Sequence, residues 1–138
     1  MKGFFRRLIA NVAEPTPTDT DQAAPLLAAD ALIAKGHAFE DIGDVVHALQ
    51  CYEQAVELSP VYPRALLNRG NAFLALGRAD AAEASYRSAI GIKPEYAEGH
   101  MNLGNLLLSR NAFAGAAHCY REALGLHPGW AEACFGLG

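Results

Sequence analysis

The chain has 138 residues, 51% of them apolar, and a formal net charge of −4 at neutral pH. This length suits one domain, and the mild negative charge, without a block of lysine or arginine, argues against a nucleic-acid-binding protein. No run of residues approaches the roughly 20 apolar residues that a membrane-spanning helix needs. We therefore expect a soluble protein with no membrane span and no nucleic-acid partner.

The cysteines favour a reducing compartment, and we expect the protein to be cytoplasmic. Cys51, Cys119 and Cys134 form an odd count without the spacing of a disulfide framework. Cys51 and Cys119 each directly precede a tyrosine. We expect the cysteines to be small packing residues with no redox or metal role.

Residues 1–12, MKGFFRRLIANV, form a short basic segment whose apolar residues share one face at helical spacing. The segment fails as a secretory signal because Arg6 and Arg7 interrupt its short apolar part. Three interpretations stay open: an interfacial membrane helix, a helix that docks in a groove of its own chain or of a second copy, and a disordered start. Residues 13–24, which contain two prolines and three threonines, are predicted to be a linker.

From residue 29 onward the same pattern of residues recurs along the chain. Gly36 and Gly70 are 34 residues apart in sequence, as are Gly70 and Gly104, and we call this separation the repeat offset. Five columns survive this shift, and in the middle repeat they hold Gly70, Ala82, Tyr86, Ala89 and Pro94. A period of about 20 to 50 residues is typical of stacked repeat architectures.

Each repeat is predicted to form two helices joined by a short turn. In the middle repeat, apolar residues at helical spacing predict a first helix over 63–76 and a second that begins at Ala79 and stops before Pro94. The small Gly70 and Ala82 allow the helices to cross closely, and Tyr86 fills the remaining gap. One hairpin cannot bury its apolar side alone, so we expect the hairpins to stack. The corresponding helices cover 26–42, 45–58, 97–110 and 113–126.

The seven residues that carry the pattern in the middle repeat resemble the tetratricopeptide repeat; they are Leu66, Gly70, Phe73, Ala82, Tyr86, Ala89 and Pro94. The resemblance implies an all-α, right-handed α-solenoid over residues 25–138, with complete repeats at 29–62, 63–96 and 97–130 and a truncated fourth at 131–138. Because the fourth repeat lacks its second helix, we expect the N-terminal part of a larger bacterial protein. A glycosyltransferase or methyltransferase domain beyond Gly138 is implied by resemblance only.

In stacked helical hairpins the first helices line a concave wall, and their side chains that point away from the second helices face a groove. The residues that helical spacing places there mix apolar and amide groups, which suits an extended peptide. We expect the ligand contacts to come from His37, Asp41, Arg64, Leu67, Asn68, Asn71, Met101, Asn102 and Asn105.

Asparagines recur at two of these repeat positions: Asn68 with Asn102, and Asn71 with Asn105. The strings around them resemble the repeats of O-linked N-acetylglucosamine transferases, where an asparagine ladder holds the backbone of an extended polypeptide. The resemblance implies that role for Asn68 and Asn102. The alternative is that these asparagines are solvated residues on an exposed helix face.

Charge narrows the expected ligand. Repeat domains that grip the C-terminal carboxylate of chaperones use lysine and arginine, whereas the matching places here hold Ile33, His37, Leu67, Glu98 and Asn102. Residues 11–62 carry nine acids and one lysine, and three of the acids, Asp30, Glu40 and Asp41, lie around His37. We expect one end of the groove to favour a basic ligand segment.

We predict no enzyme active site, no cofactor and no metal site within the chain, because its histidines are scattered over different repeat positions and no nucleophile motif is present. The leading function is a protein–protein interaction scaffold whose partner is a protein or peptide ligand. The alternative is a self-association module that forms homo-oligomers through the N-terminal segment and the open C-terminal repeat.

Overall fold

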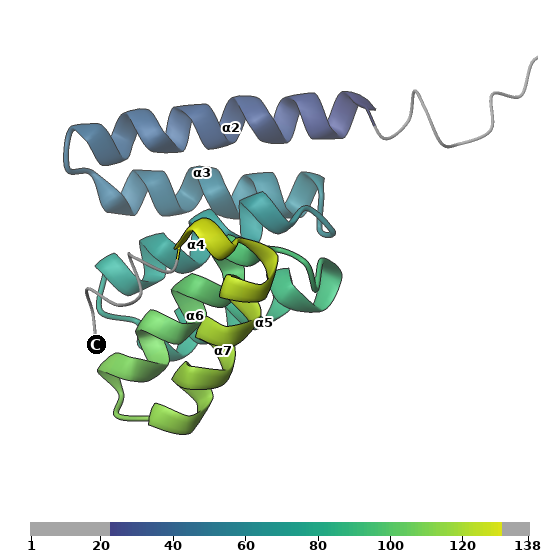
Figure 1. The fold of residues 1–138 in the computed structure, drawn as a ribbon. Helices are drawn as coiled ribbons and strands as arrows, with labels where there is room; N and C mark the ends of the chain where they lie inside the picture. The colour runs from purple at the N-terminus through teal and green to yellow at the C-terminus, as the bar shows by residue number, and fades with distance from the viewer. Residues whose placement is uncertain (1–22, 131–138) are drawn as a thin grey trace, which may run out of the picture.

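The computed structural model describes residues 23–130, and within that range every regular element is a helix (Figure 1). The predicted segment at 1–12, residues 13–22 of the linker, and the truncated repeat at 131–138 with Cys134 lie outside the described residues. The elements are α2 (Ala23–Asp41), α3 (Val45–Leu58), α4 (Pro63–Ala75), α5 (Ala79–Ile92), α6 (Ala97–Ser109), α7 (Phe113–Leu126) and the short 3₁₀ helix η1 (Pro128–Trp130).

The helices pair into three hairpins that stack in sequence order. Helix α2 packs against α3, α4 against α5 and α6 against α7, and we call these pairs hairpins 1, 2 and 3. Between hairpins, α3 packs against α4 and α5 against α6. The predicted all-α solenoid of stacked helical hairpins is therefore confirmed. In each hairpin we call the first helix the A helix and the second the B helix.

The turn inside each hairpin has a residue in the left-handed backbone conformation, and this residue lies at the same repeat position in all three hairpins. Gly43 and Gly77 have φ values of 82° and 77°, and Asn111 follows with 61°. The next residue donates its backbone N–H to a carbonyl five residues earlier, as in Arg78 N to Phe73 O at 2.8 Å. This is the bond that closes a Schellman motif, and asparagine is among the residues that tolerate the conformation best after glycine.

The repeat glycine of each A helix lies directly under the repeat tyrosine of its B helix. A methyl group added at Gly70 would lie 2.6 Å from Cε1 of Tyr86, and one at Gly36 would lie closer still to the same atom of Tyr52. Such distances are shorter than any tolerable contact, so the column of glycines allows the tyrosine rings to fill each hairpin.

The column of alanines lines the same interface. Ala48, Ala82 and Ala116 are buried, as are Cys51 and Cys119. Burial raises the pKa of the Cys119 thiol, which keeps it protonated. In hairpin 2 the equivalent residue is Ser85, which is buried and donates its hydroxyl to Ala81 O at 3.0 Å. These two cysteines are packing residues, as predicted.

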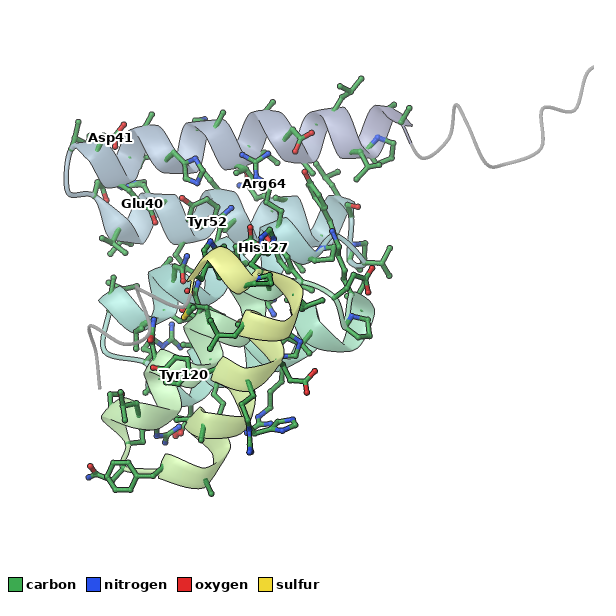
Figure 2. The ribbon with its side chains drawn as sticks, viewed as in Figure 1. Glu40, Asp41, Tyr52, Arg64, Tyr120 and His127 are labelled. Carbon is green, nitrogen blue, oxygen red and sulfur yellow. The ribbon has the colours of Figure 1, made fainter. Side chains whose placement is uncertain are left out.

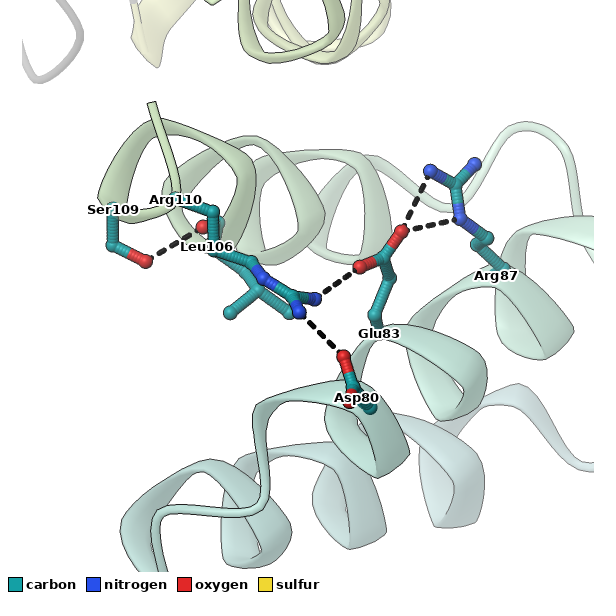
Figure 3. A network of polar contacts seen from close by, with 6 residues as sticks. All are labelled: Asp80, Glu83, Arg87, Leu106, Ser109 and Arg110. Carbon is teal, nitrogen blue, oxygen red and sulfur yellow. Dashed lines mark hydrogen bonds and ion pairs between the residues drawn. The ribbon is translucent and has the colours of Figure 1, made fainter. Parts of the chain in front are cut away.

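A polar network ties hairpin 2 to the A–B turn of hairpin 3 (Figure 3). Arg110 donates from Nη1 to Glu83 Oε2 at 2.6 Å and from Nη2 to Asp80. Glu83 also accepts from Nη2 of Arg87 at 2.9 Å. Asp80, Arg87 and Arg110 are exposed to solvent, which weakens these ion pairs, and the buried residues Leu103, Leu106 and Leu107 supply most of the packing around this interface.

Candidate functional site on the A helices

The predicted ligand residues lie on all three A helices, and they differ in exposure. Asp41, Arg64, Asn71 and Asn105 are exposed. His37, Asn68, Met101 and Asn102 are half-buried. We call the surface that these eight residues form the A-helix face. Glu40 and Asp41 lie at its acidic end, where α2 finishes (Figure 2).

Leu67 does not belong to this face. Helical spacing puts Leu67 on the side of α4 that points away from α5, which is why it was expected to contact a ligand. In the structure it is buried and packs with the cluster that includes Leu103 and Leu106 of α6. Ile33, one repeat earlier, is also buried. The next hairpin covers this side of the helix, which the spacing of residues within one helix does not show.

Polar side chains link consecutive A helices across the face. His37 Nε2 of α2 lies 3.4 Å from Asn68 Oδ1 of α4. Asn102 Nδ2 of α6 donates to Asn71 Oδ1 of α4 at 3.1 Å. These two contacts hold the side chains of Asn68 and Asn102 in place. In each asparagine, one end of the carboxamide makes the contact. Within residues 23–130, no hydrogen bond is recorded to the other end, Asn68 Nδ2 or Asn102 Oδ1.

Asn71 and Asn105 also hold their own hairpins together. Tyr86 donates its hydroxyl to Asn71 Oδ1 at 2.6 Å, and Tyr120 donates to Asn105 Oδ1 at the same distance. These bonds join the A helix to the B helix and satisfy a hydroxyl that would otherwise be costly to bury. In the sequence, Asn71 and Tyr86 recur together one repeat later as Asn105 and Tyr120. This joint recurrence is the sequence signal that predicts the pairing.

Hairpin 1 breaks the pattern because His37 replaces the asparagine. The ring of His37 meets the ring of Tyr52 edge-on, with centroids 5.9 Å apart. The Tyr52 hydroxyl is buried, and among the described residues it has no hydrogen-bond partner. Burial raises the pKa of Tyr52 far above its ordinary value, and the nearby Glu40 carboxylate adds to the rise.

The far end of α2 carries a second junction between hairpins. Asp30 accepts a hydrogen bond from the Tyr62 hydroxyl and forms an ion pair with Arg64, with 3.6 Å between Arg64 Nη1 and Asp30 Oδ1. Burial, followed by the bond to Asp30, raises the pKa of Tyr62. Arg64 and Asp30 therefore largely neutralise each other, which leaves Glu40 and Asp41 as the unpaired acids at the end of α2.

His100 is a buried structural residue. It takes the place of Leu32 and Leu66, and its Nε2 lies 2.7 Å from Pro94 O. Since a carbonyl oxygen only accepts, Nε2 carries the proton and donates. Within residues 23–130, no group of three or more His, Cys, Asp or Glu side chains is placed to hold a metal ion. None of the helices there is long and apolar enough to cross a membrane.

Comparison with protein-family models decides the identity of the repeat. The model described as tetratricopeptide repeat matches residues 33–97, which include parts of hairpin 1 and all of hairpin 2. Residues 33–97 are therefore tetratricopeptide repeats. A search of curated protein sequences found no match.

Solved tetratricopeptide-repeat domains share the arrangement of the hairpins. The first such domain of Spaghetti (RPAP3), bound to the HSP90 peptide SRMEEVD, superimposes with a TM-score of 0.76 and 24% identity, covering 81% of this chain and 89% of that one. The Arabidopsis OM64 domain gives 0.71 and 26%, covering 75% and 86%. The Sgt2 domain from Aspergillus fumigatus gives 0.69 and 25%, covering 72% and 66%. Identity at this level supports the fold more than a shared ligand.

Proposed function

We propose that the A-helix face binds an extended peptide segment of a partner protein, and that Asn68 and Asn102 hydrogen-bond its backbone. A carboxamide offers one donor group and one acceptor, as a peptide unit does. Asn68 presents an N–H donor at Nδ2 and Asn102 presents a carbonyl acceptor at Oδ1. The pair is therefore matched to the C=O and N–H groups of an extended chain, whatever its side chains are.

The observation that carries this proposal is the positioning of the two side chains by their neighbours. His37 fixes Asn68, and Asn71 fixes Asn102, while Asn71 is itself held by Tyr86. A side chain that is already ordered loses less conformational entropy when a ligand binds. Solvated asparagines without a role would not need such support, so the arrangement favours ligand binding over the alternative.

The charges of the face favour a basic ligand segment. Glu40 and Asp41 lie at the acidic end of the face and have no basic partner among the recorded ion pairs of the described residues, whereas Arg64 is paired with Asp30. A lysine or arginine of the ligand would compensate these carboxylates. We propose that the peptide places its basic residue near the end of α2.

The test is selection from a random peptide display library on the immobilised full chain, followed by fluorescence polarisation with the selected peptides. Asn68→Ala with Asn102→Ala is expected to weaken binding at least about tenfold, because two hydrogen bonds of about 1 kcal/mol each are lost. The matched control is Gln54→Ala with Ser88→Ala on the exposed sides of α3 and α5. Unchanged affinity for the folded double variant would refute the proposal.

A further inference from the structure

Helix α2 has an apolar side that nothing covers within the described residues. We call it the outer face, and it comprises Ala31, Lys35 and Ala38. The two alanines are exposed, and the apolar residues of α2 are spread around the helix between its charged ones and not confined to one side. Among the described elements, α2 packs mainly against α3 and, at a few residues, against α4.

The same repeat positions are buried in the later hairpins. Ala31 and Ala38 correspond to Ala65 and Ala72 of α4, and both of these have 0% exposure. In α6 the corresponding residues are Gly99 and Leu106, which are also buried. Lys35 corresponds to Arg69, which is half-buried and donates to Ser85 of α5, the B helix of its own hairpin. The evidence for a cover therefore comes from the two alanine positions.

The B helix of the preceding hairpin supplies that cover. Helix α3 packs against α4, and α5 packs against α6. A methyl group added at Gly99 would lie 3.1 Å from Ile90 Cγ1 of α5, so this position of α6 directly faces the preceding B helix. By the repeat symmetry, a helix that precedes α2 in the chain would lie on Ala31.

We propose that residues 1–12 form this helix and cover the outer face of α2, in the place that a preceding B helix would take. Phe4, Phe5, Leu8, Ile9 and Val12 share one face at helical spacing. The segment is only slightly shorter than the B helices of the array, each of which has 14 residues. It also precedes α2 in sequence, as a B helix precedes the next A helix.

The connection is long enough for this return. Residues 13–22 reach about 33 Å when extended, and α2, with 19 residues, is about 28 Å long. In the array only residues 59–62 separate a B helix from the next A helix. The longer connection therefore allows residues 1–12 to reach the outer face but does not hold them there. A contact between complementary surfaces is needed to keep the segment in place.

Charge bears on that contact at one end of α2. The segment carries Lys2, Arg6 and Arg7 and no acid, and Glu40 and Asp41 lie in the last turn of α2, whereas Asp30 is paired with Arg64 and the outer face itself holds Lys35. A flexible tether of this length gives an effective concentration on the order of millimolar. Docking on its own chain is therefore favoured over docking on a second copy at micromolar protein.

The test is paramagnetic broadening by a nitroxide on Ala34→Cys, an exposed position between Ala31 and Ala38. Cys51, Cys119 and Cys134 are replaced by serine, which hairpin 2 already has, as Ser85, at the position equivalent to Cys51 and Cys119. We expect the amide signals of residues 4–12 to be lost in the labelled chain. A label on Ala117→Cys in hairpin 3 is the control and should leave these signals unchanged.

A mixture of nitroxide-labelled chains with isotope-labelled, spin-free chains distinguishes the occupants. Sharp signals for residues 4–12 in the mixture, with broadening in the singly labelled chain, support docking on the same chain. Broadening in the mixture would show docking on a second copy and would overturn the proposal. Sharp signals in every sample would also overturn it, because the outer face would then be uncovered.

Two substitutions test the contact itself in the full chain. Ala38→Asp should abolish the broadening and lower the midpoint of urea unfolding, and Leu8→Asp should do the same. Once Leu8→Asp is present, adding Ala38→Asp should have almost no further effect, because the contact is already lost. An equal effect of Ala38→Asp with and without Leu8→Asp would refute the contact, whichever way the spin label behaves.

Discussion

Tyr52 and Tyr86 occupy the same repeat position, but their hydroxyl groups meet different surroundings. Tyr86 donates to Asn71 at 2.6 Å. Tyr52 faces His37 at the equivalent place, and its hydroxyl has no hydrogen-bond partner among residues 23–130. A buried hydroxyl without a partner costs about 1–3 kcal/mol. The residue difference between the hairpins, Asn71 against His37, therefore removes from Tyr52 the bond that Tyr86 makes and leaves its hydroxyl near the Glu40 carboxylate.

Substitution of the two tyrosines by phenylalanine should separate these cases. Tyr86→Phe is expected to lower the free energy of unfolding by about 1 kcal/mol or more, because Asn71 loses its donor. Tyr52→Phe is expected to be neutral or to raise that free energy by up to about 1 kcal/mol. Urea unfolding followed by circular dichroism measures both, and an equal loss in the two variants would contradict the assignment.

The same variants should also differ in how their stability depends on pH in the alkaline range. Burial raises the pKa of Tyr86 to about 12 and that of Tyr52 still further. A group with a raised folded-state pKa contributes stability that is complete below its unfolded pKa of about 10 and is lost as pH rises. The array should therefore lose stability from about pH 10 to 12, and each phenylalanine variant should lose less over that window than the parent chain.

At the scale of the helix, the sequence predicted bounds best where proline marks an end. Helices α3 and α7 have the predicted bounds, and the residues before Pro60 and Pro128 are not helical. The A helices α4 and α6 stop one residue earlier than predicted, because Leu76 and Arg110 already leave the helical conformation just before the left-handed residues Gly77 and Asn111. Helix α2 begins at Ala23, three residues before the predicted start, since Pro25 is tolerated in a first turn.

The three B helices differ at their N-termini, because only α3 has a side-chain cap. Asp44 caps α3 by accepting from the His47 backbone N–H at 3.2 Å, and that bond lowers the pKa of Asp44. Ala112 holds the same place before α7 with nearly the same backbone, φ −86° and ψ 70° against −93° and 74°. Ala112→Asp should therefore stabilise the chain by about 0.5–2 kcal/mol.

The stability of the Ala112→Asp variant at acid pH tests whether the new aspartate acts as a cap. A carboxylate with a lowered folded-state pKa stabilises above its unfolded pKa of about 3.9, and the stability is lost as pH falls through the folded value. The gain from Ala112→Asp should fade below about pH 4, whereas a gain from Ala112→Asn should persist. Ala117→Asp, which adds the same charge in the middle of α7, is the control and should not stabilise.

Contacts between hairpins were the part of the site that the sequence could not supply. The repeat identified Asn68, Asn71, Asn102 and Asn105 as a set, because that requires only the repeat offset. It did not show that Asn71 joins Asn102 or that Asp30 accepts from Tyr62, since both depend on how one hairpin is rotated on the next. The same missing geometry made Leu67 look available to a ligand.

The charge distribution of the whole array predicts which peptides it will reject. The domain of Spaghetti (RPAP3) described above holds the acidic peptide SRMEEVD, and carboxylates of that kind need basic partners. Here Ile33 is buried, Glu98 is acidic and Arg64 is already paired with Asp30. We therefore expect fluorescence polarisation to detect no binding of SRMEEVD up to about 1 mM, an affinity of roughly −4 kcal/mol.

Reversal of the charge on the A helices should create the missing recognition. Glu98→Lys with Asn102→Arg makes the net charge of α6 more positive by three and should strengthen SRMEEVD binding at least about tenfold, with an effect that weakens as salt is added. Glu122→Lys with Gln54→Arg makes the same net change on exposed positions of α7 and α3 and is the matched control. Equal gains in both variants would mean that net charge, and not the A-helix face, governs binding. Tight binding of SRMEEVD to the parent chain would show that this face recognises carboxylates by groups other than lysine and arginine.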